Sequence, residues 1–244
     1  MKFCASSGGG EELEAAFTSL SINGRDRTDP PLPDVGPPVP PRPSETDRPT
    51  DLPHILIAMR KLREGILGSR RHDSFAQRAY MFIIQASILT RQWESYQAPL
   101  LHLLHGIHPH TPLSRSELRD FVGYRILDLA CRQNDLVEAY AVQQSFKQND
   151  RRTAAVLKAL VHDDWPKFWR IRRAVDGYQR ALMEPAEERV RMHALKCLGR
   201  GYMSADKAFV ERSADARWEV MVRNGVGWQL QENGTVVIRK PKPK

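Results

Sequence analysis

The chain has 244 residues, enough for one or two domains but not three. It carries 37 Lys and Arg against 29 Asp and Glu, and it has three scattered cysteines. No window reaches the roughly 18 apolar residues that a membrane span requires. This composition argues against a membrane protein, a disulfide scaffold and a collagen-like chain, and it favours a reducing compartment, the cytoplasm or the nucleus.

The charge is unevenly distributed along the sequence. Residues 1–53 hold 5 basic and 9 acidic residues, whereas the remainder holds 32 basic and 20 acidic residues. A basic body behind an acidic leader is typical of proteins that bind nucleic acid or an acidic partner.

The N-terminal part is rich in proline. Residues 30–53 contain 10 of the 17 prolines, and proline has no amide hydrogen to donate to a helix or sheet. Residues 39–43 (VPPRP) fit an SH3 or WW ligand, although a solvated linker is the simpler interpretation. Residues 11–20 could form a short amphipathic helix on binding a partner. We predict a disordered, acidic, Pro-rich leader over residues 1–49.

From residue 50 onward, apolar residues recur at the spacing of a helix face. A capping box at Ser114-Arg115-Ser116-Glu117 marks one helix start, and Gly106 marks a helix end. The predicted helices begin at residue 50 and then cover residues 73–90, 93–106, 114–130, 134–147, 151–162 and 164–173. Because such helices must bury one another's apolar faces, we expect an antiparallel helical-repeat stack over residues 50–183, without a strict sequence period.

The last 60 residues follow a different pattern. A helix is expected to open at Glu184, followed by short helices over 204–212 and 214–224. Two β-rich runs, 226–230 and 235–239, then flank Asn233-Gly234, a strong hairpin pattern because both residues tolerate positive φ. Three short helices and a hairpin predict a winged helix over residues 184–240, with a basic tail at 241–244. The predicted fold class is therefore mainly α, with a solenoid-like helical bundle, a C-terminal winged helix and a small β-hairpin.

Helical repeats that run into a winged helix resemble the PCI domain. Residues 116–127 (SELRDFVGYRIL), 156–168 (VLKALVHDDWPKF) and 225–228 (GVGW) resemble the branch that holds the small PCI subunits of the COP9 signalosome, the proteasome lid and initiation factor three. The first two stretches are also similar to Sac3-type PCI subunits of messenger-RNA export complexes. The resemblance covers about residues 54–240. It implies a non-catalytic scaffold whose winged helix pairs edge to edge with other PCI subunits, and some PCI proteins also bind RNA or DNA.

The hairpin carries the predicted protein interface. Trp228 alternates with Gly227 and Gln229, which predicts a half-buried strand anchored by its indole. The opposite strand, from Thr235 to Arg239, could offer a free edge that pairs with another sheet. The predicted interface residues are Trp228, Thr235, Val237 and Arg239.

A basic surface supports the alternative function, RNA binding. Between residues 151 and 180, eight Lys and Arg are interleaved with Trp165, Phe168, Trp169 and Tyr178, so phosphate pairing and base stacking are both conceivable. The competing interpretation is that these aromatics belong to the core and that the arginines are solvated or paired. Arg217 and Arg223 flank Trp218 on the expected recognition helix. The candidate RNA-binding residues are Arg151, Arg152, Lys167, Arg170, Arg172, Arg173, Arg217, Arg223 and Lys240.

Candidate metal and catalytic clusters have simpler explanations. His102, His105, His108 and His110 lie close in sequence, but no Cys, Asp or Glu accompanies them and Pro109 interrupts the run. Asp163 and Asp164 point about 100° apart on a helix, so helix capping explains them better than acid–base chemistry. We therefore expect no enzyme activity, metal, cofactor, membrane or small-molecule substrate, and we expect other PCI subunits as partners, with RNA as the alternative.

Overall fold

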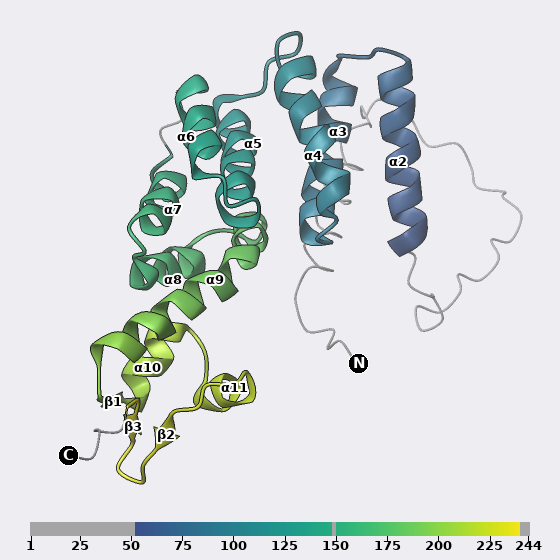
Figure 1. The fold of residues 1–244 in the computed structure, drawn as a ribbon. Coiled ribbons are helices and arrows are strands. Elements are labelled where there is room, and N and C mark those ends of the chain that lie inside the picture. The colour runs from purple at the N-terminus through teal and green to yellow at the C-terminus, as the bar shows by residue number, and fades with distance from the viewer. Residues whose placement is uncertain (1–51, 148–149, 240–244) are drawn as a thin grey trace, which may run out of the picture. The chain divides into compact units, whose positions relative to one another are not determined.

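The protein is described here by a computed structural model that covers residues 52–147 and 150–239. The chain divides into two compact units between Pro112 and Leu113. The predicted leader, the basic tail and Lys240 lie outside the described residues. The described part is mainly helical with a small antiparallel sheet near its C-terminal end, which confirms the predicted fold class (Figure 1).

The first unit consists of helices in chain order. They are α2 (Leu52–Gly68), α3 (Ser74–Leu89) and α4 (Trp93–His102), which continues into the π-helical turn η2 (Leu103–Ile107). Asp73 caps α3 by accepting a hydrogen bond from the Ala76 backbone N–H at 2.9 Å. This bond and the neighbouring Arg71 lower the pKa of the Asp73 carboxyl.

The helix end predicted at Gly106 is wrong, because the chain continues through this residue as η2. A Cβ atom at position 106 would lie 2.8 Å from the Nδ1 and Cε1 atoms of the His102 ring. That ring is held against Tyr80, with the two ring centroids 5.0 Å apart. Glycine is therefore present because an imidazole packs on it, and not because the helix ends there.

The second unit begins with a run of helices. They are α5 (Arg115–Leu127), its π-helical extension η3 (Asp128–Arg132), α6 (Leu136–Ser145), α7 (Arg151–Val161), α8 (Trp165–Ala174) and α9 (Gly177–Gly201). The capping box at Ser114 is confirmed, since the Ser114 side chain accepts from the Glu117 N–H and the Glu117 carboxylate accepts from the Ser114 N–H. An aspartate caps each of the four helices that follow, at Asp135, Asp150, Asp164 and Asp176.

Three helix–helix connections share one local conformation. Each contains a residue with left-handed backbone geometry, then the N-cap residue, then a bulky apolar residue that opens the next helix. The left-handed residues are Arg91, Asn134 and Asp163, with φ of 56°, 58° and 52°. The apolar residues that follow are Trp93, Leu136 and Trp165. The repeated feature is a turn rather than a fixed spacing, which explains why the sequence shows no strict period.

The second unit ends in a winged-helix arrangement. After α9 come β1 (Ser204–Asp206), α10 (Lys207–Ala214), α11 (Trp218–Arg223), β2 (Gln229–Leu230) and β3 (Thr235–Val237). The strands form an antiparallel sheet in the order β1-β3-β2. The predicted hairpin is confirmed, since the Gln231 N–H donates to the Thr235 carbonyl at 2.9 Å and Gly234 supplies a φ of 81°. The sequence did not reveal β1.

The helix start predicted at Glu184 is wrong, because α9 begins at Gly177 and includes Pro185 in its interior. The predicted division between residues 183 and 184 therefore falls inside this helix. An interior proline costs about 3 kcal/mol, since it removes one helix hydrogen bond and crowds the preceding turn. Burial of Leu182, Met183 and Ala186 around the proline offsets this cost.

The winged-helix core is an apolar cluster to which α9, α10, α11 and β3 all contribute. Its buried members are Leu195, Leu198, Val210, Ala214, Trp218, Met221 and Val236. Trp228 is partly buried against this cluster, so its predicted anchoring role is confirmed. The C-terminal half of α9 thus serves as the first helix of the winged helix.

Trp169 on α8 is the contact that joins the helical stack to the winged helix. Its side chain is 1% exposed, and its Nε1–H donates to the Ser213 carbonyl of α10 at 3.0 Å. The Arg191 guanidinium of α9 lies 5.7 Å from the centroid of the indole. A single side chain therefore contacts three helices.

We expect Trp169→Ala to lower the free energy of unfolding by about 3–5 kcal/mol, because a large buried ring is lost. Trp169→Phe should cost less, about 1–3 kcal/mol, mainly because the Ser213 carbonyl loses its donor. Urea denaturation followed by far-ultraviolet circular dichroism measures both changes. The matched control is Val137→Ala, since Val137 is 83% exposed and should change stability by less than about 0.5 kcal/mol. Equal effects of all three variants would contradict the role of Trp169.

Candidate interaction surfaces

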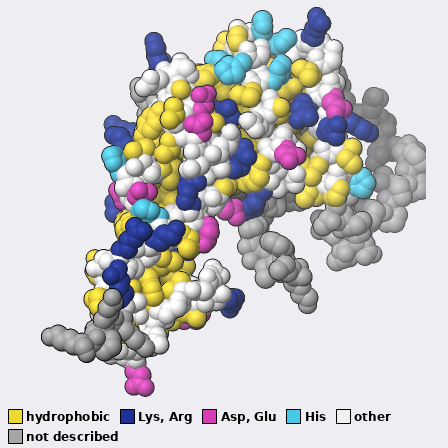
Figure 2. Space-filling view, viewed as in Figure 1, with side chains coloured by type: hydrophobic (Ala, Val, Ile, Leu, Met, Phe, Trp, Pro, Cys, Tyr) yellow, Lys and Arg dark blue, Asp and Glu magenta, His cyan; other side chains and the backbone are white. Residues whose placement is uncertain are grey.

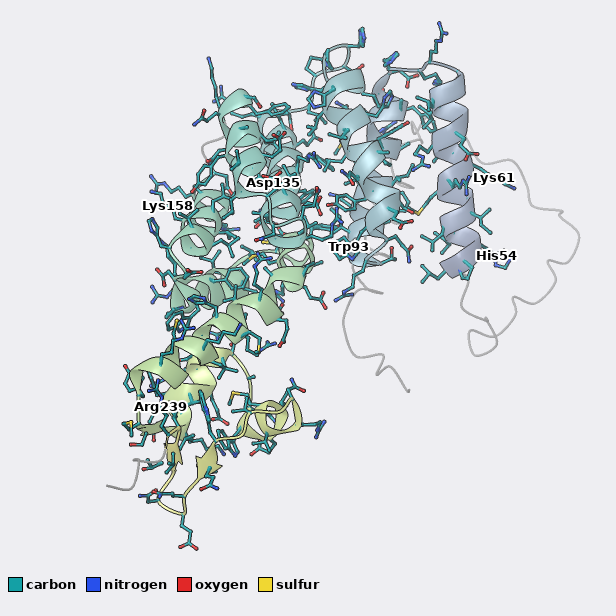
Figure 3. All side chains as sticks on the ribbon, in the orientation of Figure 1. His54, Lys61, Trp93, Asp135, Lys158 and Arg239 are labelled. Atoms are coloured by element: carbon teal, nitrogen blue, oxygen red, sulfur yellow. The ribbon has the colours of Figure 1, made fainter. Side chains whose placement is uncertain are left out.

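The free edge predicted from Thr235 to Arg239 is wrong, because β3 is the central strand of the sheet. Thr235 and Val237 pair with β1 on one side, and Val237 pairs with Gln229 of β2 on the other. Arg239 is also held inside the fold, since its Nε–H donates to the Gly199 carbonyl of α9 at 2.6 Å (Figure 3). The physical reason is β1, which follows α9 at once and covers the side of β3 that the sequence left open.

Within residues 204–237, the edges of the sheet are β1 and β2. In an antiparallel pair, residues alternate between bonding the partner strand and pointing their N–H and C=O groups outward. The Gln231 N–H bonds Thr235, and the same register pairs Leu230 with Val236, so the backbone groups of Leu230 point away from β3. On β1, the bonds at Met203 and Lys207 make Ser204 the corresponding outward residue.

The two edges differ in how open they are. β1 runs directly into α10, and the Asp206 side chain at its end caps that helix by accepting from the Phe209 N–H at 3.3 Å. β2 is exposed along both of its residues, and the Leu230 side chain is 40% exposed. The accessible strand edge of the described sheet is therefore β2.

The aromatic part of the predicted RNA surface is wrong for two of its four residues. Phe168 and Trp169 are each 1% exposed, so neither ring can stack on a base. Trp165 is partly buried, and the Tyr178 ring packs 5.9 Å from that of Tyr124. The alternative interpretation, that these aromatics belong to the core, holds for Phe168 and Trp169.

Several predicted RNA-binding cations are engaged within the protein. Arg172 donates to the Glu187 carboxylate, and Arg173 donates to that of Asp215. Burial raises the pKa of Glu187 even though Arg172 beside it acts to lower it. These arginines hold α8 against α9 and against the end of α10, so they are structural first.

Other cations remain on the surface. Arg151, Arg152, Arg170, Arg217 and Arg223 are exposed and form no ion pair with any residue in the described ranges, whereas Lys167 is partly buried. Figure 2 shows Lys and Arg side chains gathered over α8 and α9, and Figure 3 shows Lys158 projecting outward from α7. Lys240, which completed the prediction, lies outside the described residues.

A groove that sequence reasoning missed lies between the starts of α6 and α8 and the side of α9. Its volume is about 250 Å³. Its apolar lining consists of Leu136, Ala159, Leu160, Trp165, Phe168 and Val190, and its polar lining of Asn134, Asp163, Arg189 and His193. We call it the α6–α9 groove. The repeated turn could have revealed it, because Asn134 with Leu136 and Asp163 with Trp165 occupy equivalent places in two such turns.

A Cys–His–Asp arrangement lies beside this groove but lacks the geometry of a catalytic triad. His193 Nε2 lies 3.3 Å from Cys197 Sγ and 3.7 Å from an Asp163 carboxylate oxygen. A triad needs the nucleophile and the carboxylate on opposite ring nitrogens, and here both approach Nε2. Asp164 caps α8 by accepting from the Lys167 N–H, as predicted.

Histidines also gather in the first unit. The His72 ring lies 4.7 Å from that of His110 and 6.2 Å from that of His102. Burial and the neighbouring His72 lower the pKa of His102. Across the described ranges, no group of three or more His, Cys, Asp or Glu side chains is arranged to hold a metal ion.

Comparison with known proteins yields no relative: no model of a known protein family matches the chain, and no curated protein matches it. Among the helices of residues 52–147 and 150–239, none combines the length and apolar character needed to cross a membrane.

The two described cysteines should differ sharply in reactivity. Cys131 is buried in η3, and burial raises the pKa of its thiol to about 12, so about one molecule in 10,000 carries the thiolate near pH 8. Cys197 is partly exposed. In a Cys4→Ser background, Ellman's reagent should therefore titrate one thiol in the native protein and a second only in denaturant. Adding Cys197→Ser should remove the native reaction, and rapid native labelling in that variant would contradict the burial of Cys131.

Proposed function

We propose that this chain is a non-catalytic scaffold subunit of a multiprotein complex of the PCI type, in the cytoplasm or the nucleus. The observation that carries the proposal is the accessible edge of β2 at the end of a helical stack that continues into the winged helix through α9. Its partners are other PCI subunits, as the sequence resemblance implies. Neither a catalytic constellation nor a metal cluster among the described residues argues for an enzyme instead.

Assembly would occur by addition of a partner strand to β2. The outward N–H and C=O groups of Leu230, and those of Trp228 two residues earlier, are the groups that such a strand would bond. Each backbone hydrogen bond contributes about 0.5–1.5 kcal/mol net, so a few bonds give only a few kcal/mol. A micromolar complex needs about 8 kcal/mol, and the helical stack must therefore supply a second contact surface.

RNA binding is the second candidate function, and the exposed cations favour it. Residues 151–201 hold 12 basic and six acidic residues. The buried Phe168 and Trp169 rings weaken this alternative, because the remaining interaction would be with phosphates alone and would carry no base stacking.

The test uses two proline variants that differ only in the edge that they block. Leu230→Pro removes the outward N–H of β2, and Ser204→Pro removes that of β1; neither change removes a hydrogen bond within the sheet. We expect the tagged wild-type chain to co-purify with a second winged-helix subunit, identified by mass spectrometry. Leu230→Pro should abolish this association, and Ser204→Pro should retain it.

Two outcomes would contradict the scaffold function. One is association that survives both proline variants. The other is a monomeric chain that recovers no protein subunit and binds single-stranded RNA tightly, with an affinity that falls steeply as salt rises. Circular dichroism of both variants shows whether the fold is retained.

A further inference from the structure

The α6–α9 groove is an apolar depression with no side chain of residues 52–147 or 150–239 inside it. Its floor is formed by buried Ala159 and Phe168, and its walls by partly buried Leu136, Leu160 and Val190. The surrounding surface continues the apolar character, since Val137 next to Leu136 is 83% exposed and Val161 next to Leu160 is 46% exposed. Apolar surface of this kind is favourable to cover.

The size of the groove selects the kind of ligand. Its volume of about 250 Å³ lies below the 300–1,000 Å³ that is typical of small-molecule and cofactor sites. A cavity of about 150 Å³ already accommodates a benzene ring. The groove is therefore suited to one bulky apolar side chain and part of a neighbouring one, as a peptide segment presents them.

The charge around the groove selects the character of that peptide. Arg189 is exposed, and its guanidinium donates to the neutral Ala130 carbonyl at 3.3 Å, so no carboxylate within the described ranges compensates its charge. The Asp163 carboxylate, the acidic group of the lining, already faces His193 at 3.7 Å. Across α7 to α9, basic residues outnumber acidic ones by 12 to six. Carboxylates on a ligand would be attracted here, whereas a basic peptide would be repelled.

We propose that the α6–α9 groove binds a short acidic segment of a partner protein, which inserts one bulky apolar side chain and places its carboxylates beside Arg189. The proposal rests on the proposed scaffold function, because it supplies the second contact surface that strand addition at β2 requires. Trp165 forms one wall of the groove, and His193 lies against it with the two ring centroids 6.0 Å apart.

The experiment is a selection from a random peptide library displayed on phage, with the full chain as bait and its Val190→Glu variant for counter-selection. Enriched peptides should combine a Leu, Ile, Phe or Trp with flanking Asp or Glu. A synthetic peptide of the most enriched sequence should bind the Val190→Glu chain about 10- to 100-fold more weakly, because the variant places a carboxylate in the apolar pocket. Fluorescence anisotropy of the labelled peptide measures this loss.

A matched pair of variants on α9 separates local charge from net charge. Arg189→Glu should weaken the synthetic peptide about tenfold, whereas Arg200→Glu makes the same charge change about 16 Å further along the helix. That distance exceeds the Debye length of about 8 Å at physiological salt, so Arg200→Glu should leave the affinity within about twofold. Because both arginines are exposed, these variants should fold even if Val190→Glu does not.

Several results would overturn the proposal. Failure to enrich any peptide, enrichment of basic peptides, or equal binding to the wild-type and Arg189→Glu chains would do so. Competition by a synthetic peptide of residues 11–20 would identify the chain's own leader as the occupant, and self-association lost in Val190→Glu would identify a second copy. Leu230→Pro should bind the selected peptide normally, so failure at the groove and failure at the sheet edge are distinguishable.

Discussion

The burial of Trp169 between α8, α9 and α10 is the interaction on which the second unit depends. A helix as long as α9 is only marginally stable in water by itself, and Pro185 weakens it further. The indole offsets this weakness by its buried area and by its hydrogen bond to Ser213. Arg191 reinforces the same junction, since its Nε–H donates to the Ala214 carbonyl of α10 at 2.9 Å. The helical stack and the winged helix are consequently parts of one packed unit.

This junction also determines which strand edge is accessible. Because α9 is fixed against α10, the chain leaving it at Tyr202 enters β1 directly, and β1 pairs with β3. The Met203 carbonyl accepts hydrogen bonds from the N–H groups of Ile238 and Arg239, which extends the pairing beyond the strand itself. With β1 in this position, β3 can only be central. The accessible edge then passes to β2, on the other arm of the hairpin.

The sequence predicted features that depend on neighbours in the chain, and it failed where distant residues decide. Ser114 and Asp164 cap helices and Gly234 closes the hairpin, because a few consecutive residues fix each of these conformations. Gly106 and Glu184 were misassigned because their environments come from the packing of a His102 ring and from the burial of both halves of α9. The groove was missed for the same reason, although its two left-handed turns were visible as an Asn or Asp followed by a capping Asp.

Counting charges along the sequence overstates the cationic surface that a phosphate backbone could use. Arg172, Arg173 and Arg191 donate to carboxylates or carbonyls that stabilise the junction around Trp169, so part of the positive charge is already compensated inside the unit. Arg189 differs, since its partner is a neutral carbonyl at the side of an apolar groove. An uncompensated cation next to exposed apolar surface favours a ligand that carries both a carboxylate and a hydrophobic group. Peptide segments combine these two properties, whereas an RNA backbone supplies only the charge.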